Sequence, residues 1–537
     1  MQRLRRYSLI LAFLVVGGFI GVYLAQLTRE EAPSQAEAEE PAGRADRGPG
    51  VPADPREVLI PEQFSPTIEI PYPAGAIRGE MALRFRSRED YRAYLAALRR
   101  AGLAPLGQID ELLTLRVDEE ALAALDPLRY GATPDYSYAV ERPPPPKEVS
   151  PEALAMLQAY GRSAREIVGG PVEGDGSGVL VGILDSGIAA HPQFDDVYIV
   201  HVDLAGGGVA GPGAAHGTSV ASIITGTEGV APEAELFVVR VLDDEGLGNS
   251  FHVAEGIVQA ADLGVQVMNL SLGLYQDSQV LREAVRYAQD KGMLLVAAAG
   301  NDGFGRLPYP AGYPEVVSVT AIDAAERQAL FPNQSERIDF AAPGVGILTA
   351  KDDEGTELFT GTSAAAPFVT GTVAALLSAD PDLTGKGAVE ILRRHRNEAG
   401  AGGVDPVYGG GILDWNRVRE RKMAGIADLA LAEIYLAPDA RPGTTMPVTL
   451  TVENRGTRWL SGAEMTVLVN DRDPVEFSIE AIGPGQTATR KVYTSVPSEN
   501  DETGLEVAAQ VLTEAMTDDV RPENNQKAVS YRPRAAE

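Results

Sequence analysis

The sequence predicts a doubly wound α/β domain of mostly parallel strands, with a small α+β module before it and an antiparallel β-sandwich after it. Residues 178–420 alternate short apolar runs with helical patterns, which is typical of buried parallel strands. Residues 75–142 alternate strand and helix patterns within a short length, and residues 427–532 alternate apolar and polar positions between turn residues. At 537 residues the chain is long enough for these three parts.

The composition excludes several classes of function. A formal net charge of -30 argues against a nucleic-acid partner, which would require clustered lysines and arginines. The chain contains 0 cysteines, which excludes thiol catalysis, disulfides and cysteine-ligated zinc.

The first 27 residues predict a membrane anchor. No residue between Arg6 and Arg29 is charged, and a bilayer span needs about 20 apolar residues, whereas signal-peptide cores are shorter. The pattern therefore favours an uncleaved transmembrane anchor over a cleaved signal. Arginines before the span place the N-terminus in the cytoplasm and the rest of the chain outside it, in the periplasm or at the cell surface. Residues 28–74 are acidic and rich in Pro, Ala and Gly, which predicts a disordered linker.

The module over residues 75–142 is expected to be a small α+β sandwich. Ser87 and Asp90 have the spacing of a helix cap, and an apolar stripe at helical spacing follows them. Strands are expected at 80–87, 112–118 and 136–141, with a second helix over 119–125. Four consecutive prolines, 143–146, end the module because they cannot continue a helix or a ladder. Residues 143–177 then form a second linker and the mature N-terminus.

In the α/β domain the expected strands are the apolar runs at 178–185, 234–242, 265–272, 292–301 and 316–322, with helices over 251–263 and 278–291. In an open α/β sheet the active crevice lies at the carboxyl ends of the strands. Polar residues occur at such ends: Asp185, Asn269, Ser271 and Asn301. A carboxylate that ends a buried strand needs a partner, and His216 could provide one. Asp holding His, and His serving Ser, is the arrangement of acyl transfer.

Two serines, each within a Gly-Thr-Ser run, compete to be the nucleophile. Ser219 follows His216 by three residues in the same helix, where the backbone would have trouble presenting both side chains to one carbonyl. Ser363 comes from another part of the chain and begins a helix, where free N–H groups and the helix dipole favour negative charge. Ser363 is therefore the better candidate.

These residues lie in motifs that resemble the subtilisin-like (subtilase) serine peptidases. The motifs are "VGILDSGI" at 181–188, "HGTSVASII" at 216–224, "VAAAGN" at 296–301, "FAAPG" at 340–344 and "GTSAAAPFVTGTVAALL" at 361–377, followed by "VYGGGILDWNRV" at 407–418. The chain order Asp, His, Ser is also that of subtilisin. The resemblance implies a serine endopeptidase that uses an acyl-enzyme intermediate.

The resemblance also implies a role for each site residue. Asp185 would orient the imidazole, His216 would act as base and then acid, Ser363 would attack, and Asn301 would donate to the oxyanion beside the Ser363 N–H. An extended substrate strand would lie against Ser271, Leu272 and Gly273, with Gly246, Leu247 and Gly248 on its other side. The small wall of Ala297, Ala298 and Ala299 would leave room for a fairly large apolar side chain.

No cofactor is required for this chemistry. The acidic clusters at 195–196, 243–245 and 352–354 are interpreted as solvated turns, with structural calcium as the alternative, because none has EF-hand spacing. His252 and His395 are interpreted as helix-surface residues, and the metal content is left open.

The flanking parts imply the remaining partners. The 75–142 module resembles a subtilase propeptide, which implies a zymogen that cleaves itself within 143–170, leaves its anchor and is released or secreted. The alternative is an exosite or an ordinary packing domain. Residues 427–532 resemble a CARDB-type, Ig-like domain, which implies adhesion or wall binding, with a stabilising appendage as the alternative. The expected partners are protein or peptide substrates, the membrane and the chain's own module. The rival hypothesis is a catalytically inactive, envelope-anchored adhesion protein on a protease fold.

Overall fold

The computed structural model describes residues 73–144, 157–351, 355–437, 440–470, 472–497, 504–513 and 518–531. The expected anchor (1–27) and nearly all of the expected linker (28–74) lie outside these residues. So do residues 145–156 of the second linker and the acidic cluster at 352–354.

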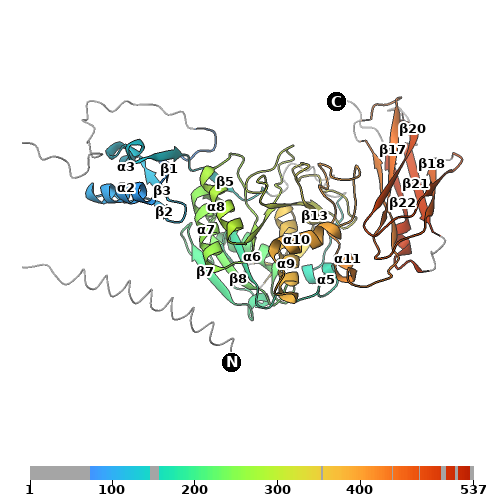
Figure 1. The fold of residues 1–537 in the computed structure, drawn as a ribbon, viewed down its shortest axis with the longest axis horizontal. Coiled ribbons are helices and arrows are strands. Elements are labelled where there is room, and N and C mark those ends of the chain that lie inside the picture. The colour runs from blue at the N-terminus through green and yellow to red at the C-terminus, as the bar shows by residue number, and fades with distance from the viewer. Residues whose placement is uncertain are drawn as a thin grey trace, which may run out of the picture. The chain divides into compact units, whose positions relative to one another are not determined.

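The N-terminal module is an antiparallel sheet with two helices (Figure 1). Its strand order is β2-β3-β1-β4, formed by β1 (Glu80–Phe85), β2 (Gly107–Ile109), β3 (Thr114–Asp118) and β4 (Ala132–Asp135). The helices are α2 (Arg88–Arg100) and α3 (Glu119–Ala124). The predicted cap of α2 is confirmed, because Ser87 Oγ accepts a hydrogen bond of 3.1 Å from the Asp90 N–H.

The last strand expected in the module has a different partner. Only residues 139–141 of the expected 136–141 form a strand, β5 (Ala139–Glu141), and β5 pairs with β9 (Leu247–Asn249) of the α/β domain. The module's own sheet ends instead at β4, which pairs with β1. An alternating pattern specifies a strand but not its neighbour, so the sequence could not distinguish these two edges.

A seven-stranded parallel sheet forms the α/β domain, in the order β13-β12-β11-β10-β6-β8-β7. Its strands are β6 (Leu180–Asp185), β7 (Ile199–Asp203), β8 (Glu235–Arg240), β10 (Val267–Leu270), β11 (Leu294–Ala298), β12 (Val317–Ile322) and β13 (Phe340–Pro343). Except for the edge strand β7, these strands bury apolar side chains on both faces, so the predicted parallel sheet is confirmed.

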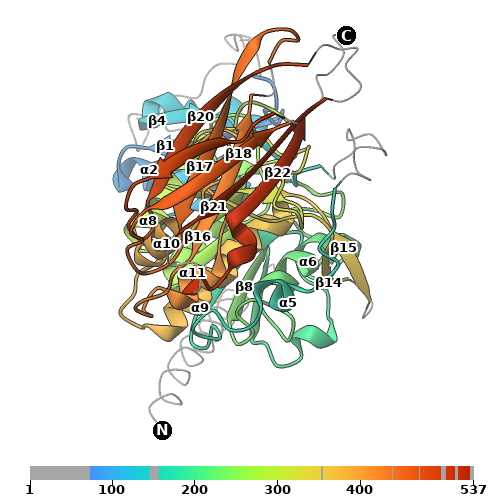
Figure 2. The ribbon, with the colours of Figure 1, turned by 90° about the vertical axis from the view of Figure 1, so that its right-hand side faces the viewer.

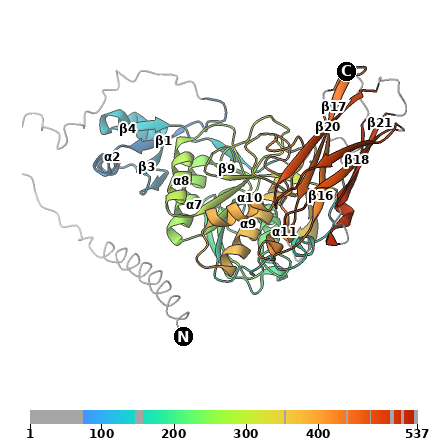
Figure 3. The same ribbon diagram turned by 45° about the vertical axis from the view of Figure 1, so that its right-hand side comes forward.

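Helices cover both faces of this sheet. One core contains residues of α6 (Ala215–Ile224), α9 (Thr362–Ala379) and α10 (Gly385–Arg394). The other contains residues of α7 (Ser250–Leu263) and α8 (Gln279–Asp290), which lie side by side in Figures 1 and 3. Within the described part of the chain, α9 alone is long and apolar enough to cross a membrane. It is 89% buried, as expected of a central helix in a protein core.

The C-terminal domain is a sandwich of two antiparallel sheets (Figure 2). One sheet consists of β16 (Leu429–Leu436), β17 (Thr445–Asn454) and β20 (Thr487–Ser495). The other consists of β18 (Ala463–Val469), β19 (Val475–Ile479), β21 (Leu505–Leu512) and β22 (Gln526–Tyr531). Buried and exposed positions alternate along β18 and β21, so one face of the sheet packs on the core between the sheets.

Candidate active site

The carboxyl ends of three neighbouring strands bring polar residues to one edge of the parallel sheet. Asp185 is the last residue of β6, Ser271 follows β10, and Asn301 comes three residues after β11. Because β6 pairs with β10 and β10 pairs with β11, all in parallel, these ends lie next to one another. This is the edge where open α/β sheets bind their ligands.

Asp185 and His216 form a hydrogen-bonded pair. His216 Nδ1 lies 2.8 Å from Asp185 Oδ1, and Asp185 is fully buried at 0% exposure. A carboxylate can only accept, so Nδ1 carries the proton and Nε2 keeps its lone pair. His216 is the second residue of α6, so the helix holds the imidazole over the end of β6.

Ser363 lies in the first turn of α9, which packs against α6. Its side chain is 2% exposed, and its Oγ has no hydrogen-bond partner among the described residues. Four residues earlier, Phe359 ends β15 (Thr356–Phe359) and packs edge-on against the His216 ring, with centroids 5.3 Å apart. The segment from Phe359 into α9 thus brings Ser363 to the region of the imidazole.

Asn301 is oriented by Thr362. Its Oδ1 accepts from the Thr362 N–H at 3.0 Å and from Thr362 Oγ1 at 2.8 Å, so Nδ2 is left to donate. At Gly361, where φ is +147°, an added Cβ would lie 3.0 Å from Asn301 Nδ2 and 3.7 Å from the Ser363 nitrogen. Both nitrogens therefore lie within 4 Å of the position that a side chain at Gly361 would occupy.

Ser219, the other candidate nucleophile, has different hydrogen-bond partners. Ser219 Oγ donates to Glu357 Oε1 at 2.8 Å and lies 3.2 Å from the carbonyl oxygen of Ala350. Ser219 is fully buried, and these bonds tie α6 to the hairpin of β14 (Ile347–Ala350) and β15. Its hydroxyl therefore has a structural role.

The two segments expected to bind an extended peptide both bind residues 139–144 of this chain, called the strap below. Glu141 and Gly273 exchange two backbone hydrogen bonds, of 3.1 and 2.9 Å. On the other side the Arg142 N–H donates to the Gly246 carbonyl at 3.2 Å, and β5 pairs with β9, which contains Leu247 and Gly248. The strap therefore adds as a strand between the two segments.

Ser271 and Leu272, which precede Gly273, are buried beneath the cleft between the two peptide-binding segments. Ser271 is buried, and its Oγ donates to the Ser363 carbonyl at 3.3 Å and accepts from Asn269 Nδ2 at 2.9 Å. Leu272 is buried in the core that α7 and α8 cover. Both residues hold the segment in place, while Gly273 makes the contacts with the strap.

The three alanines expected to form a wall are all fully buried. Ala297 and Ala298 pack into the cores on opposite faces of the sheet. A cavity of about 240 Å³ beside the strap is lined by the next residue, Gly300, together with Pro143, Pro144 and Gly273.

Two contributions could not be found from sequence patterns. Thr362 orients Asn301, yet in the sequence it is one small residue of a Gly-Thr-Ser run. Pro144 accepts a 3.0 Å hydrogen bond from Asn301 Nδ2, although its proline run is typical of a linker. The only signal for Thr362 was its place in a motif, and Pro144 lies outside all of the motifs.

The described residues contain no group of three or more His, Cys, Asp or Glu side chains that could hold a metal ion. In the 243–245 cluster, Asp243 Oδ1 accepts from the N–H groups of Glu245 and Leu247, and Asp244 pairs with Arg240 at 2.9 Å. These carboxylates serve the local turn. A structural calcium ion stays a prediction.

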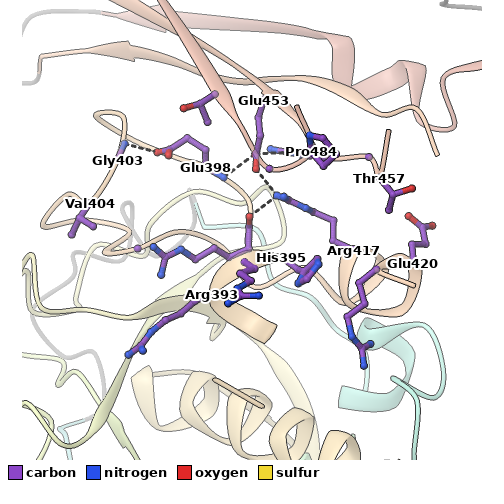
Figure 4. A pocket seen from close by; sticks show the side chains of 18 residues that line it. Arg393, His395, Glu398, Gly403, Val404, Arg417, Glu420, Glu453, Thr457 and Pro484 are labelled. Atoms are coloured by element: carbon purple, nitrogen blue, oxygen red, sulfur yellow. Dashed lines mark hydrogen bonds and ion pairs between the residues drawn. The ribbon is translucent and has the colours of Figure 1, made fainter. Parts of the chain in front are cut away.

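A larger cavity, of about 650 Å³, lies away from these residues (Figure 4). Its lining comes from the end of the α/β domain and from the sandwich, where Arg417 pairs with Glu453 at 2.5 Å. Burial raises the pKa of Glu398 to about 7 there, and the Glu453 carboxylate adds to this effect. None of the residues at the strand ends lines this cavity.

Comparison with known proteins agrees with this geometry. The profile of the Subtilase family matches residues 176–411, and that of CARDB matches residues 426–529. Subtilisin Savinase of Lederbergia lenta is 35% identical over 252 residues, which cover 44% of this chain and 90% of that protein. Alkaline protease of Alkalihalobacillus alcalophilus is also 35% identical over 252 residues, 44% of this chain and 63% of that protein. Minor extracellular protease Epr of Bacillus subtilis (strain 168) is 34% identical over 254 residues, 45% of this chain and 38% of that protein. The chain therefore belongs to the subtilase family of serine peptidases and carries a CARDB domain after its peptidase domain.

Proposed function

We propose that the chain is a serine endopeptidase of the cell envelope that hydrolyses peptide bonds through Asp185, His216 and Ser363. The observation that carries the proposal is the 2.8 Å bond between His216 Nδ1 and the fully buried Asp185. It leaves Nε2 as the basic nitrogen of a ring that packs against Phe359, four residues before Ser363.

In the first step Ser363 Oγ attacks the substrate carbonyl carbon, and His216 takes the hydroxyl proton. Asp185 stabilises the imidazolium that results. The negative oxygen of the tetrahedral intermediate accepts from Asn301 Nδ2 and the Ser363 N–H, two groups whose nitrogens both lie close to Gly361. His216 then protonates the leaving nitrogen, and water hydrolyses the acyl-enzyme by the reverse sequence of proton transfers.

The proposal extends to location and processing. The apolar segment 1–27 would anchor the chain, with the peptidase domain outside the cytoplasm. Residues 75–142 would act as a propeptide, and cleavage within 143–170 would free the peptidase domain from its anchor. The antiparallel module and its strap in the cleft support a propeptide role.

A fluorophosphonate probe tests the catalytic proposal. We expect covalent labelling of the full chain, or of a variant with a loosened strap, at Ser363. Ser363→Ala and His216→Ala should abolish it while circular dichroism shows an unchanged fold. If no folded form reacts, the proposal is wrong and the inactive adhesion protein becomes the better hypothesis.

A further inference from the structure

The strap places one particular peptide bond at the site. Asn301 Nδ2 is the donor proposed for the carbonyl oxygen of the bond under attack, and it lies 3.0 Å from the carbonyl oxygen of Pro144. The bond that follows this carbonyl joins Pro144 to Pro145. If Asn301 binds the carbonyl under attack, as proposed above, the bond held at the site is therefore one between two prolines.

Backbone contacts hold the strap on both sides before it reaches this bond. Glu141 exchanges two hydrogen bonds with Gly273, and Arg142 donates to Gly246. Val140, the middle residue of β5, is fully buried in the core. After Arg142 the prolines have no N–H to donate, so the ladder ends two residues before the presented bond.

A bond between two prolines is a poor substrate for acyl transfer. Attack would form the Ser363 Oγ–carbon bond and break the carbon–nitrogen bond of Pro145, with the proton passing through His216 to that nitrogen. The Pro145 nitrogen carries ring Cδ where other residues carry hydrogen, which crowds the preceding residue and the approach of the imidazole. Consecutive prolines are also stiff, so the carbonyl cannot adjust to the attack geometry.

The same stiffness favours binding. A segment that is already extended loses little conformational entropy when it occupies the cleft. Its backbone still pairs with the cleft on both sides and its Pro144 carbonyl still accepts from Asn301.

We infer that the strap is a cleavage-resistant, intramolecular ligand of the active-site cleft, and that the tetraproline keeps the chain latent by preventing self-cleavage at the bond it presents. Latency then ends only when a bond outside 143–146 is cut or the strap leaves the cleft. This inference rests on the proposed function, since a ligand of an inactive cleft would regulate nothing.

The first test changes the presented bond in the full chain. Pro144→Leu with Pro145→Ser restores an N–H donor and an ordinary leaving nitrogen, and we expect cleavage after residue 144, seen by intact mass and N-terminal sequencing. Wild type and the matched control Pro146→Ser should stay intact at that position. Adding Ser363→Ala to the double variant should restore the intact chain.

The second test measures access to the cleft. Glu141→Pro removes the N–H that donates to Gly273, and Glu141→Ala keeps it. We expect the fluorophosphonate probe to label the proline variant about five- to tenfold faster than the alanine variant, as for the loss of one hydrogen bond.

The outcomes separate the two proposals. Self-cleavage of wild type between residues 144 and 145, or equal labelling of both Glu141 variants together with an uncut double variant, would overturn the inference while the catalytic proposal stands. Absence of both labelling and cleavage in every folded variant would instead overturn the catalytic proposal.

Discussion

At the scale of single residues, His216 and Asn301 each have two polar side-chain atoms, and one of the two is hydrogen-bonded to another residue of the site. Asp185 occupies His216 Nδ1 and leaves Nε2, while Thr362 occupies Asn301 Oδ1 and leaves Nδ2. In each case a buried partner fixes which atom can serve a substrate. The orienting residues are therefore as testable as the reacting ones.

We expect Asn301→Ala to lower kcat by about 10²–10³ with a small change in KM, a magnitude carried over from another member of the family. Thr362→Val leaves the Asn301 amide donor in the chain but removes the 2.8 Å hydrogen bond from Thr362 Oγ1 to Asn301 Oδ1. We therefore expect kcat to fall less, by about tenfold. Steady-state kinetics on a peptide substrate, with the strap removed by processing, measures both. A Thr362→Val variant as impaired as Asn301→Ala would contradict a positioning role.

At the scale of elements, two helices that begin with Gly-Thr-Ser runs support different groups. In α6 the residue before the run, His216, faces Asp185, and Ser219 binds the β14–β15 hairpin. Gly217 allows α6 to approach β6 closely, since an added Cβ would lie 2.1 Å from the Gly187 carbonyl oxygen and 3.3 Å from Asp185 Cβ.

Gly217→Ala should therefore displace His216 from Asp185, costing about 1–3 kcal/mol of stability and most of the activity. Ser219→Ala in the same helix should cost about 1 kcal/mol through its lost hydrogen bonds and keep its turnover. Denaturant unfolding and kinetics of both variants provide the comparison. Equal loss of turnover in the two would show that α6 as a whole, rather than its contact at Gly217, determines activity.

The sequence predicted five buried strands because their apolar runs are continuous, as in β6 and β11. The buried strand β13 was not predicted, because its apolar run is only four residues long and ends in proline. The edge strand β7 was missed because its residues are half-buried or exposed and show no such run. The pairing of Asp185 with His216 was predictable from motifs in a fixed order, while Ser363 as the third member of the group stays a prediction. The strap's position was not, because pairing between β5 and β9 joins segments about one hundred residues apart, which local patterns do not encode.

At the scale of the whole molecule, the N-terminal module contacts the peptidase domain at a second place besides the strap. Arg116 of β3 lies 3.0 Å from His252 Nε2 on α7, and Asn249 Nδ2 lies 3.1 Å from its Nδ1. His252 is thus half-buried against the module rather than on a free helix surface. Both ring nitrogens face N–H donors, so a second ring proton would remove the one hydrogen bond that the neutral ring can accept there.

Burial, together with the Arg116 guanidinium, lowers the pKa of His252 to about 4, although the Asp203 carboxylate opposes the shift. An undocked histidine with the ordinary value of 6.5 takes up a proton that the docked one does not. Docking should therefore be strongest above pH 6.5 and weaken as the pH falls toward 4.

Hydrogen exchange of the Glu141 amide in the Ser363→Ala chain, followed across this pH range and corrected for intrinsic exchange, measures docking. His252→Gln should flatten the dependence. A wild-type profile that stays flat between these pH values would contradict the assignment.

The strap belongs to the same chain as the cleft in which it lies, and this affects the kinetics of inhibition. A tethered ligand competes at an effective concentration set by its linker, of millimolar order for a short one, and this concentration does not change on dilution. Binding of the strap to the cleft of its own chain should therefore be a first-order step, and the degree of inhibition should not depend on protein concentration. A peptide substrate offered in solution would have to compete against that fixed local concentration, however dilute the enzyme is.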